Sequence, residues 1–123
     1  TYSSRRSAEY IHAHDCQGDE EVCGVAVEYS TLTIFTVIVI ANYGIEWPRL
    51  EADDFIMAIC SIRSLEDACR IAYRELIYWL ERDFGFERYD AYMMLSQCGK
   101  VRLGNFVDPK YTVRAAIPKK YIS

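Results

Sequence analysis

Hydrophobic and polar residues change their spacing along the chain, and each change marks the boundary of a predicted element. Small and β-branched residues alternate over residues 22–29, which predicts a strand, and residues 32–40 predict a second strand that is apolar on both faces from its third position onward. Residues 30–31 form a short break between them, so the two strands are expected to pair as a hairpin. Residues 42–48 have the composition of a turn, in which Trp47 is expected to be exposed.

The clearest predicted helix begins after Ser64 and ends at Gly85. Ser64 is followed three residues later by Asp67, a spacing typical of a capping box with Asp in the place of the usual Glu. Glycine is the preferred residue directly after a helix, which suits Gly85. Apolar residues recur at helical spacing between these ends, at Leu65, Cys69, Ala72, Leu76 and Trp79 or Leu80.

Three more strands and a shorter helix complete the pattern. Residues 55–61 predict the strand before the long helix, and residues 89–97 predict a second helix that stops at Gly99. Residues 101–107 and 112–117 predict two final strands joined by an Asp-Pro turn. This order predicts an α+β fold, with two helices packed on one side of a mostly antiparallel sheet.

The chain has 123 residues, which suits one domain and leaves no room for two independent cores. We expect a polar arm over residues 1–10 and a single domain over residues 11–123. The doubly apolar stretch of residues 34–40 needs cover on both sides. Because the chain itself offers no such cover, we expect another chain or another copy to supply it.

Charge and cysteine usage exclude several classes of protein. The net charge is −4 and the basic residues occur in scattered pairs, which argues against a nucleic-acid partner. The longest apolar run, residues 34–41, is too short to cross a bilayer, so no membrane partner is expected. The five cysteines are irregularly spaced without a Cys-x-x-Cys pair, which predicts reduced thiols in a cytoplasmic protein rather than a zinc knuckle.

Four of the ten tyrosines fall on the two predicted helices, at Tyr73, Tyr78, Tyr89 and Tyr92. Aromatic side chains at such positions more often complete a core or a subunit interface than bind a ligand. We therefore expect these tyrosines to face the core or another subunit.

Two histidines, His12 and His14, stand two residues apart in a polar segment that is rich in acids. In an extended segment, residues two apart point to the same side. Two imidazoles with carboxylates nearby suit a divalent metal such as zinc. A solvated surface pair that arose by chance is the alternative, and a metal held only for structural purposes is a third possibility.

Asp19 and Glu21 add two carboxylates to the same segment. If the segment is extended they also share a side, and a carboxylate there can accept the proton of a metal-bound water. The alternative is a solvated acidic loop. A thiol nucleophile at Cys16 or Cys23, activated by His14, is a further alternative.

Residues 14–24, with the sequence HDCQGDEEVCG, resemble the signature of the acetamidase/formamidase family, which is typically GDxHAxQGDGEVCG. The resemblance continues in shorter motifs that follow in the family's order, over residues 47–51, 64–68, 74–76, 90–96, 107–109 and 117–119. It extends over nearly the whole chain after the first ten residues. It corresponds to the C-terminal portion of the longer family proteins.

The resemblance implies the C-terminal part of the acetamidase/formamidase-like fold and an amidase that hydrolyses small linear amides, of the formamide or acetamide type, to a carboxylate and ammonia. It also implies a divalent metal, expected to be zinc, held by histidine and acid side chains. His14 matches the family histidine and is the first candidate metal ligand, with His12 and Asp19 as the others. Glu21 is expected to be the general base, Asp19 a ligand or orienting group, and Gln17 a further member of the catalytic set.

Three positions depart from the family pattern. His12 stands where the family has Asp, Asp15 replaces a small residue, and Glu20 replaces the glycine between the two acids. These changes define the alternative function, a non-catalytic assembly or ligand-binding subunit that kept the fold and lost the chemistry. Because family chains are considerably longer, the resemblance also implies a second chain that supplies the N-terminal part of the fold, a homo-oligomer, or both.

Overall fold

The computed structural model describes residues 8–15, 27–107 and 109–122. The elements in chain order are β1 (Ala8–Asp15), β2 (Val27–Ile34), β3 (Arg49–Glu51), β4 (Phe55–Ile62), α1 (Leu65–Phe84), α2 (Arg88–Cys98), β5 (Lys100–Asn105), β6 (Tyr111–Pro118) and the short 3-10 helix η1 (Lys119–Tyr121). Among the described residues, 8–15 and 27–44 form one compact unit, and 45–107 and 109–122 form another. The expected division into an arm of residues 1–10 and one domain of residues 11–123 stays a prediction.

The first unit contains an antiparallel hairpin of β1 and β2, in which Ala8 is opposite Ile34 and Asp15 is opposite Val27. The predicted hairpin between residues 22–29 and 32–40 is therefore wrong. Residues 30–31 do not break the chain, because their backbone continues the β2 ladder against β1. The strand ends at Ile34, and residues 35–40 belong to no strand. Pairing with a strand that lies earlier in the sequence outweighed the local preference for a break.

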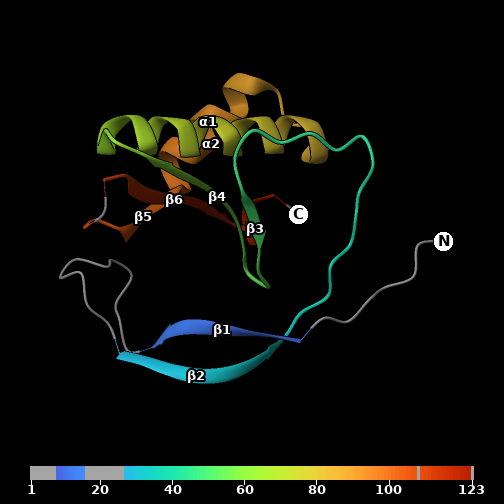
Figure 1. Ribbon diagram of the computed structural model, residues 1–123. Coiled ribbons are helices and arrows are strands. Elements are labelled where there is room, and N and C mark those ends of the chain that lie inside the picture. The colour runs from blue at the N-terminus through green and yellow to red at the C-terminus, as the bar shows by residue number, and fades with distance from the viewer. Residues whose placement is uncertain (1–7, 16–26, 108, 123) are drawn as a thin grey trace. The chain divides into compact units, whose positions relative to one another are not determined.

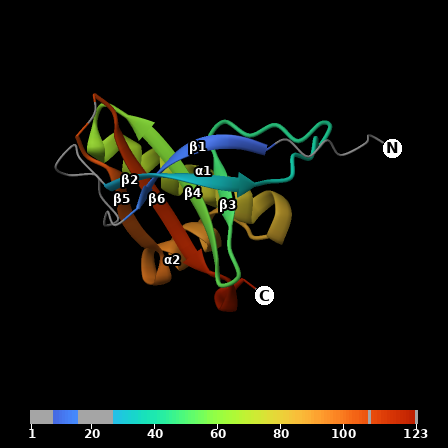
Figure 2. The same ribbon diagram turned by 60° about the horizontal axis from the view of Figure 1, so that its bottom comes forward.

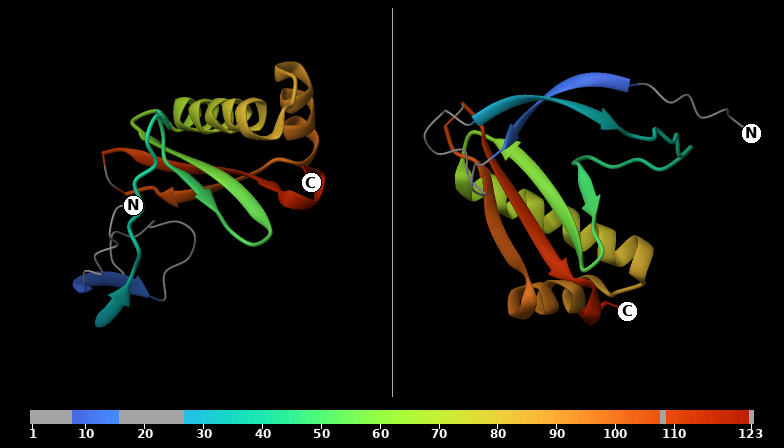
Figure 3. Two further views of the ribbon diagram at one scale, coloured as in Figure 1. Left: turned by 90° about the vertical axis from the view of Figure 1, so that its right-hand side faces the viewer. Right: turned by 90° about the horizontal axis from the view of Figure 1, so that it is seen from below.

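The second unit is a four-stranded antiparallel sheet with the strand order β3-β4-β6-β5. Helix α1 packs on β4 and β6, and α2 packs on α1 and β6. Figures 1 and 3 show both helices on the same face of this sheet, and Figure 2 shows its strands side by side. The predicted α+β architecture is confirmed.

The core of this unit lies between α1 and the sheet. Along β4, buried and half-buried residues alternate, so that Ile56, Ala58 and Cys60 face the helices. Alternation of side chains along a strand explains the pattern, because every second residue points to the same face. The same rule places Val113, Ala115 and Ile117 of β6 in the core. On α1, residues four apart share one face of the helix, and Ala68, Ala72, Leu76 and Leu80 are buried on that face.

The ends of α1 confirm the capping signals. The Ser64 hydroxyl accepts a hydrogen bond from the backbone N–H of Asp67 at 3.3 Å. Gly85 has a φ of 72°, the left-handed conformation that favours glycine. Helix α2 was predicted over residues 89–97 and extends one residue further at each end. Within the described residues, no helix is both long enough and apolar enough to cross a membrane.

Two details differ from the expected surface. Trp47 is not exposed but half-buried, and it packs against the core beside the short strand β3, which the sequence did not predict. Tyr73 packs against the core as expected, whereas the side chains of Tyr89 and Tyr92 are 82% and 58% exposed. These two tyrosines therefore do not complete the core of this chain, and their place in a subunit interface stays a prediction.

Candidate functional site

The structure describes only part of the predicted metal and catalytic segment. His12 and His14 both lie in β1, opposite Ser30 and Glu28 of β2. Gln17, Asp19 and Glu21 fall outside the described residues. Among the residues that are described, no three histidine, cysteine or acidic side chains gather closely enough to hold a metal ion. The metal site and the catalytic set therefore stay predictions.

The hairpin register adds one acid that the sequence analysis did not single out. Glu28 of β2 is the direct cross-strand neighbour of His14. The sequence did not indicate that Glu28 is opposite His14, because Glu28 belongs to a segment that was predicted to pair with residues 32–40. Only the correct strand pairing brings it to the position opposite His14.

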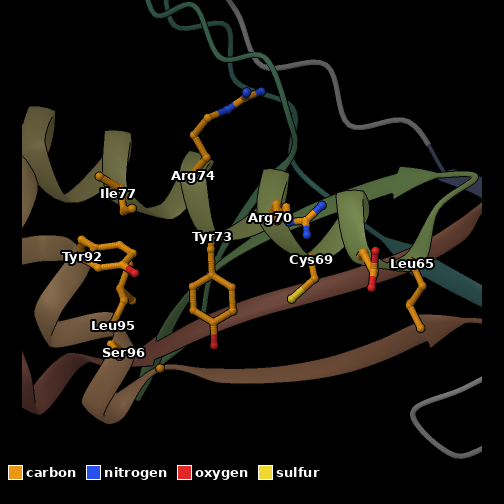
Figure 4. A pocket seen from close by; sticks show the side chains of 11 residues that line it. Leu65, Cys69, Arg70, Tyr73, Arg74, Ile77, Tyr92, Leu95 and Ser96 are labelled. Atoms are coloured by element: carbon orange, nitrogen blue, oxygen red, sulfur yellow. The ribbon is translucent and has the colours of Figure 1, made fainter.

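A hollow of about 690 Å³ lies along α1 and α2, and we call it the α1–α2 groove. Figure 4 shows the side chains of Cys69 and Tyr73 on one side of α1, with Arg74 pointing away from them. Tyr92, Leu95 and Ser96 border it from α2. The lining residues are Leu65, Glu66, Cys69, Arg70, Tyr73, Arg74, Ile77, Tyr92, Leu95, Ser96 and Gly99.

Helical spacing builds this groove from the sequence. Leu65, Cys69, Tyr73 and Ile77 are separated by four residues each, so they line one stripe of α1. Arg70 and Arg74 each follow one of these residues directly in the sequence. Each arginine forms an ion pair with a carboxylate. Arg70 lies 3.2 Å from Asp67, and Arg74 lies 3.9 Å from Glu46. The floor of the groove is therefore apolar, and one of its edges carries ion pairs.

Gly99 allows the phenol of Tyr73 to lie against the end of α2. A Cβ atom at position 99 would collide with the carbonyl oxygen of Leu95 and would lie 2.9 Å from Cε1 of Tyr73. Burial, and secondarily the neighbouring Cys69 thiol, raise the pKa of Tyr73 above its usual value of 10.0. The Tyr73 hydroxyl is therefore neutral at physiological pH, and it can donate a hydrogen bond inside the groove.

The lining of the groove, as far as the structure describes it, contains a thiol without a neighbouring base. Cys69 is a free thiol, but no histidine belongs to the lining of the groove as the structure describes it. A thiol nucleophile needs a neighbouring base or cation that stabilises the thiolate. Both arginines at the edge are bound to carboxylates. The groove therefore offers an apolar surface with a phenol and a thiol.

The solved structures that this chain resembles include two acetamidases and one predicted acetamidase/formamidase. The acetamidase of Yersinia enterocolitica is 61% identical over 89% of this chain, with a TM-score of 0.86, and the match covers 33% of the acetamidase. The acetamidase of Bacillus halodurans is 25% identical over 88% of this chain, with a TM-score of 0.74, and the match covers 37% of it. A predicted acetamidase/formamidase of Thermoanaerobacter tengcongensis shares the fold, at 24% identity over 88% of this chain and 36% of its own, with a TM-score of 0.80.

No protein-family model and no curated protein matches the sequence. The chain spans about a third of the length of the solved structures that it matches. The resemblance to acetamidase/formamidase proteins that the sequence predicted is thereby confirmed, and it is confined to a part of their length.

Proposed function

We propose that this chain, which resembles one third of an acetamidase, is part of an amidohydrolase that cleaves the carbon–nitrogen bond of small linear amides. The observation that carries the proposal is the 61% identity to the acetamidase of Yersinia enterocolitica over 89% of the chain. The signature-like segment around His14 and Glu21 also supports it, because it contains residue types that can act in general acid–base catalysis.

The donor set of this segment fits a divalent metal, for which zinc is the expected ion. Imidazole nitrogens and carboxylate oxygens are its usual protein ligands, and β1 carries two imidazoles at a spacing of two residues. His14, His12 and Asp19 would hold the ion. When bound, such an ion lowers the pKa of a water molecule and polarises a carbonyl group.

The remaining chemistry belongs to the side chains of the chain. Glu21 takes a proton from the attacking water and passes it to the departing nitrogen, so that the carbon–nitrogen bond breaks to release ammonia and leave a carboxylate. Asp19 has two alternative roles: it is either a ligand of the metal ion or a group that orients the reacting atoms. The side-chain amide of Gln17 carries both a hydrogen-bond donor and an acceptor, so it is suited to orient the amide substrate by hydrogen bonds.

The exposed apolar segment of residues 34–40 is expected to be covered by another chain or by a further copy of this chain. The chain spans about a third of the matched acetamidase. The apolar segment of residues 34–40 supports the proposal, because Ile38 and Val39 are 77% and 88% exposed. Exposed apolar runs of this kind mark surfaces that associate with protein.

The test is a measurement of ammonia release from formamide and acetamide by the native protein with any chain that copurifies with it. Glu21→Gln removes the base and keeps the shape of the side chain, so we expect the rate to fall about 100-fold or more. Glu87→Gln is the matched control, because Glu87 is exposed and makes no side-chain capping bond at α2. Full activity of Glu21→Gln would remove Glu21 from the mechanism.

The alternative is a subunit that kept the fold and lost the chemistry. It is motivated by His12 and Glu20, which replace the family's aspartate and glycine. Metal analysis of the native protein separates the two functions. A protein without stoichiometric metal and without amide turnover would favour the non-catalytic subunit over the amidohydrolase.

A further inference from the structure

Three large side chains of α2 are exposed beside the α1–α2 groove. Tyr89 is 82% exposed, Tyr92 58% and Met93 55%. Tyr92 and Met93 follow Tyr89 by three and four residues, so all three lie on one side of the helix, and we call them the α2 ridge. The ridge borders the groove, because Tyr92 also belongs to the lining of the groove.

The composition and area of the ridge are those of a protein interface. Tyrosine and methionine are enriched where interfaces are most buried, and tyrosine often carries much of the binding energy. An aromatic side chain presents about 150–250 Å², so the exposed parts of Tyr89 and Tyr92 amount to about 200–350 Å². Each partner of a standard interface buries about 800 Å². The two tyrosines supply about a quarter of this area or more, and Met93 and the groove are available for the rest.

The ridge and the groove are opposite in shape and lie next to each other on one surface. A contact with twofold symmetry needs such a surface, because both copies present the same patch. The groove has a volume of about 690 Å³, which is the size of a site for a drug-sized ligand and leaves room for a phenol ring. A ridge from a second copy can therefore enter the groove while the first ridge enters the groove of that copy.

Charges on the two parts of this surface are complementary. Asp90 follows Tyr89 directly on α2, whereas Arg70 and Arg74 belong to the edge of the groove. Each arginine now pairs with an exposed carboxylate, and ion pairs of this kind contribute little to stability. The arginines can exchange these partners for a carboxylate of another molecule. A ridge that enters the groove carries such a carboxylate toward this basic edge.

We propose that the α2 ridge and the α1–α2 groove form a twofold-symmetric interface between two copies of this chain, with Tyr89 of each copy in the groove of the other. The Tyr73 hydroxyl in the groove can donate a hydrogen bond to the phenol oxygen of the incoming Tyr89. A second copy is favoured over an unrelated partner, because one surface supplies both the ridge and the recess, and both the acid and the bases. The interface is separate from the exposed segment of residues 34–40 and goes beyond the proposed function.

Sedimentation velocity of the native protein over a hundredfold range of concentration tests the interface. Tyr89→Ser removes the ring, and it leaves the core intact because Tyr89 is so exposed. Each residue occurs twice in a twofold contact, so we expect the dissociation constant of the dimer to rise about 100-fold, or about tenfold for each lost ring. Tyr121→Ser is the matched control, because Tyr121 is an exposed tyrosine of η1 that belongs neither to α2 nor to the groove. It should leave the dimer unchanged.

Photochemical cross-linking identifies what lies in the groove. The photoreactive amino acid benzoylphenylalanine is placed at position 89 of the native protein, and isotopically labelled and unlabelled copies are mixed and allowed to exchange. We expect cross-links that join residue 89 of one isotopic form to residues 65–77 of the other. The proposal is overturned by a native protein that is monomeric at every concentration, or by a dimer that Tyr89→Ser leaves unchanged. Cross-links from residue 89 only to its own copy, or to a different protein, would also overturn it.

Discussion

Arg49 of β3 and Glu75 of α1 form a buried ion pair that ties the edge strand of the sheet to the long helix. Both Nε and Nη2 of Arg49 lie 2.7 Å from Oε1 of Glu75, and the two side chains are only 8% and 4% exposed. The guanidinium carbon also lies 5.1 Å from the centroid of the Trp79 ring. A charge that is buried among apolar groups is tolerated because its partner is held so close.

Breaking this pair from one side should destabilise the protein strongly. Arg49→Met leaves the carboxylate of Glu75 buried beside a methionine, and we expect the free energy of unfolding to fall by about 3–5 kcal/mol. Urea unfolding measures it. The double variant Arg49→Met, Glu75→Met removes both charges and should recover much of the loss. A double variant as unstable as the single one would contradict this explanation.

Gly99 should not tolerate a side chain. Gly99→Ala would force its new methyl group against Leu95 and Tyr73, so either the end of α2 or the phenol must move. We expect a loss of about 1–3 kcal/mol in the free energy of unfolding, the usual cost of overpacking. Gly44→Ala is the control, because nothing lies within 4 Å of the added atom, and it should change stability by less than about 0.5 kcal/mol. Equal effects of the two substitutions would refute the packing argument.

Ionisation of the Cys60 thiol should lower the free energy of unfolding in alkaline solution. Burial raises its pKa above the ordinary value of 9.0, and the positive charge of Arg74 opposes this to a smaller extent. Well below pH 9 the thiol is neutral in both the folded and the unfolded chain. Above it the unfolded chain loses this proton first, so the free energy of unfolding falls as pH rises toward the pKa of the folded state.

Urea unfolding at several pH values from 8 to 10.5 checks this sign. As pH rises, we expect the free energy of unfolding to fall less steeply in Cys60→Ala than in the unchanged protein. A constant difference in stability caused by the missing sulfur does not affect this comparison of slopes. The comparison isolates Cys60, because the other thiols and the tyrosines are present in both proteins. Parallel pH profiles would show that Cys60 does not couple to folding.

The exposed segment of residues 34–40 should cause association of the isolated chain. Ile38→Lys and Val39→Lys place charges where the two most exposed apolar side chains of this segment now stand. We expect gel filtration to show a smaller species for the double variant than for the unchanged chain, because a charged patch resists association. Identical elution of both proteins across a tenfold concentration range would exclude this segment as an interface.

The parts of the fold that depend on local signals were predictable. Ser64 and Gly85 delimit α1 through capping and a left-handed φ, and both signals act within a few residues of the helix ends. Strand β4 was predictable for a similar reason, since its β-branched and apolar residues lie in one short run. Such elements need no information from distant parts of the chain.

The parts that depend on pairing between distant segments were not predictable. Residues 30–31 have the composition of a break, yet they continue β2 because β1 pairs with it. Trp47 lies in a turn-like segment, yet it packs against the core. Arg102 and Arg114 are twelve positions apart in the sequence and meet only through the register of β5 and β6. Of the candidate site, only the strand that carries His12 and His14 can be compared with the structure.

The most direct test of the proposed function measures zinc content and ammonia release from acetamide on the same preparation of the native protein. The account predicts stoichiometric zinc and measurable turnover, and it predicts that His14→Ala loses both together. Turnover at an unchanged rate in the zinc-free His14→Ala protein would contradict it.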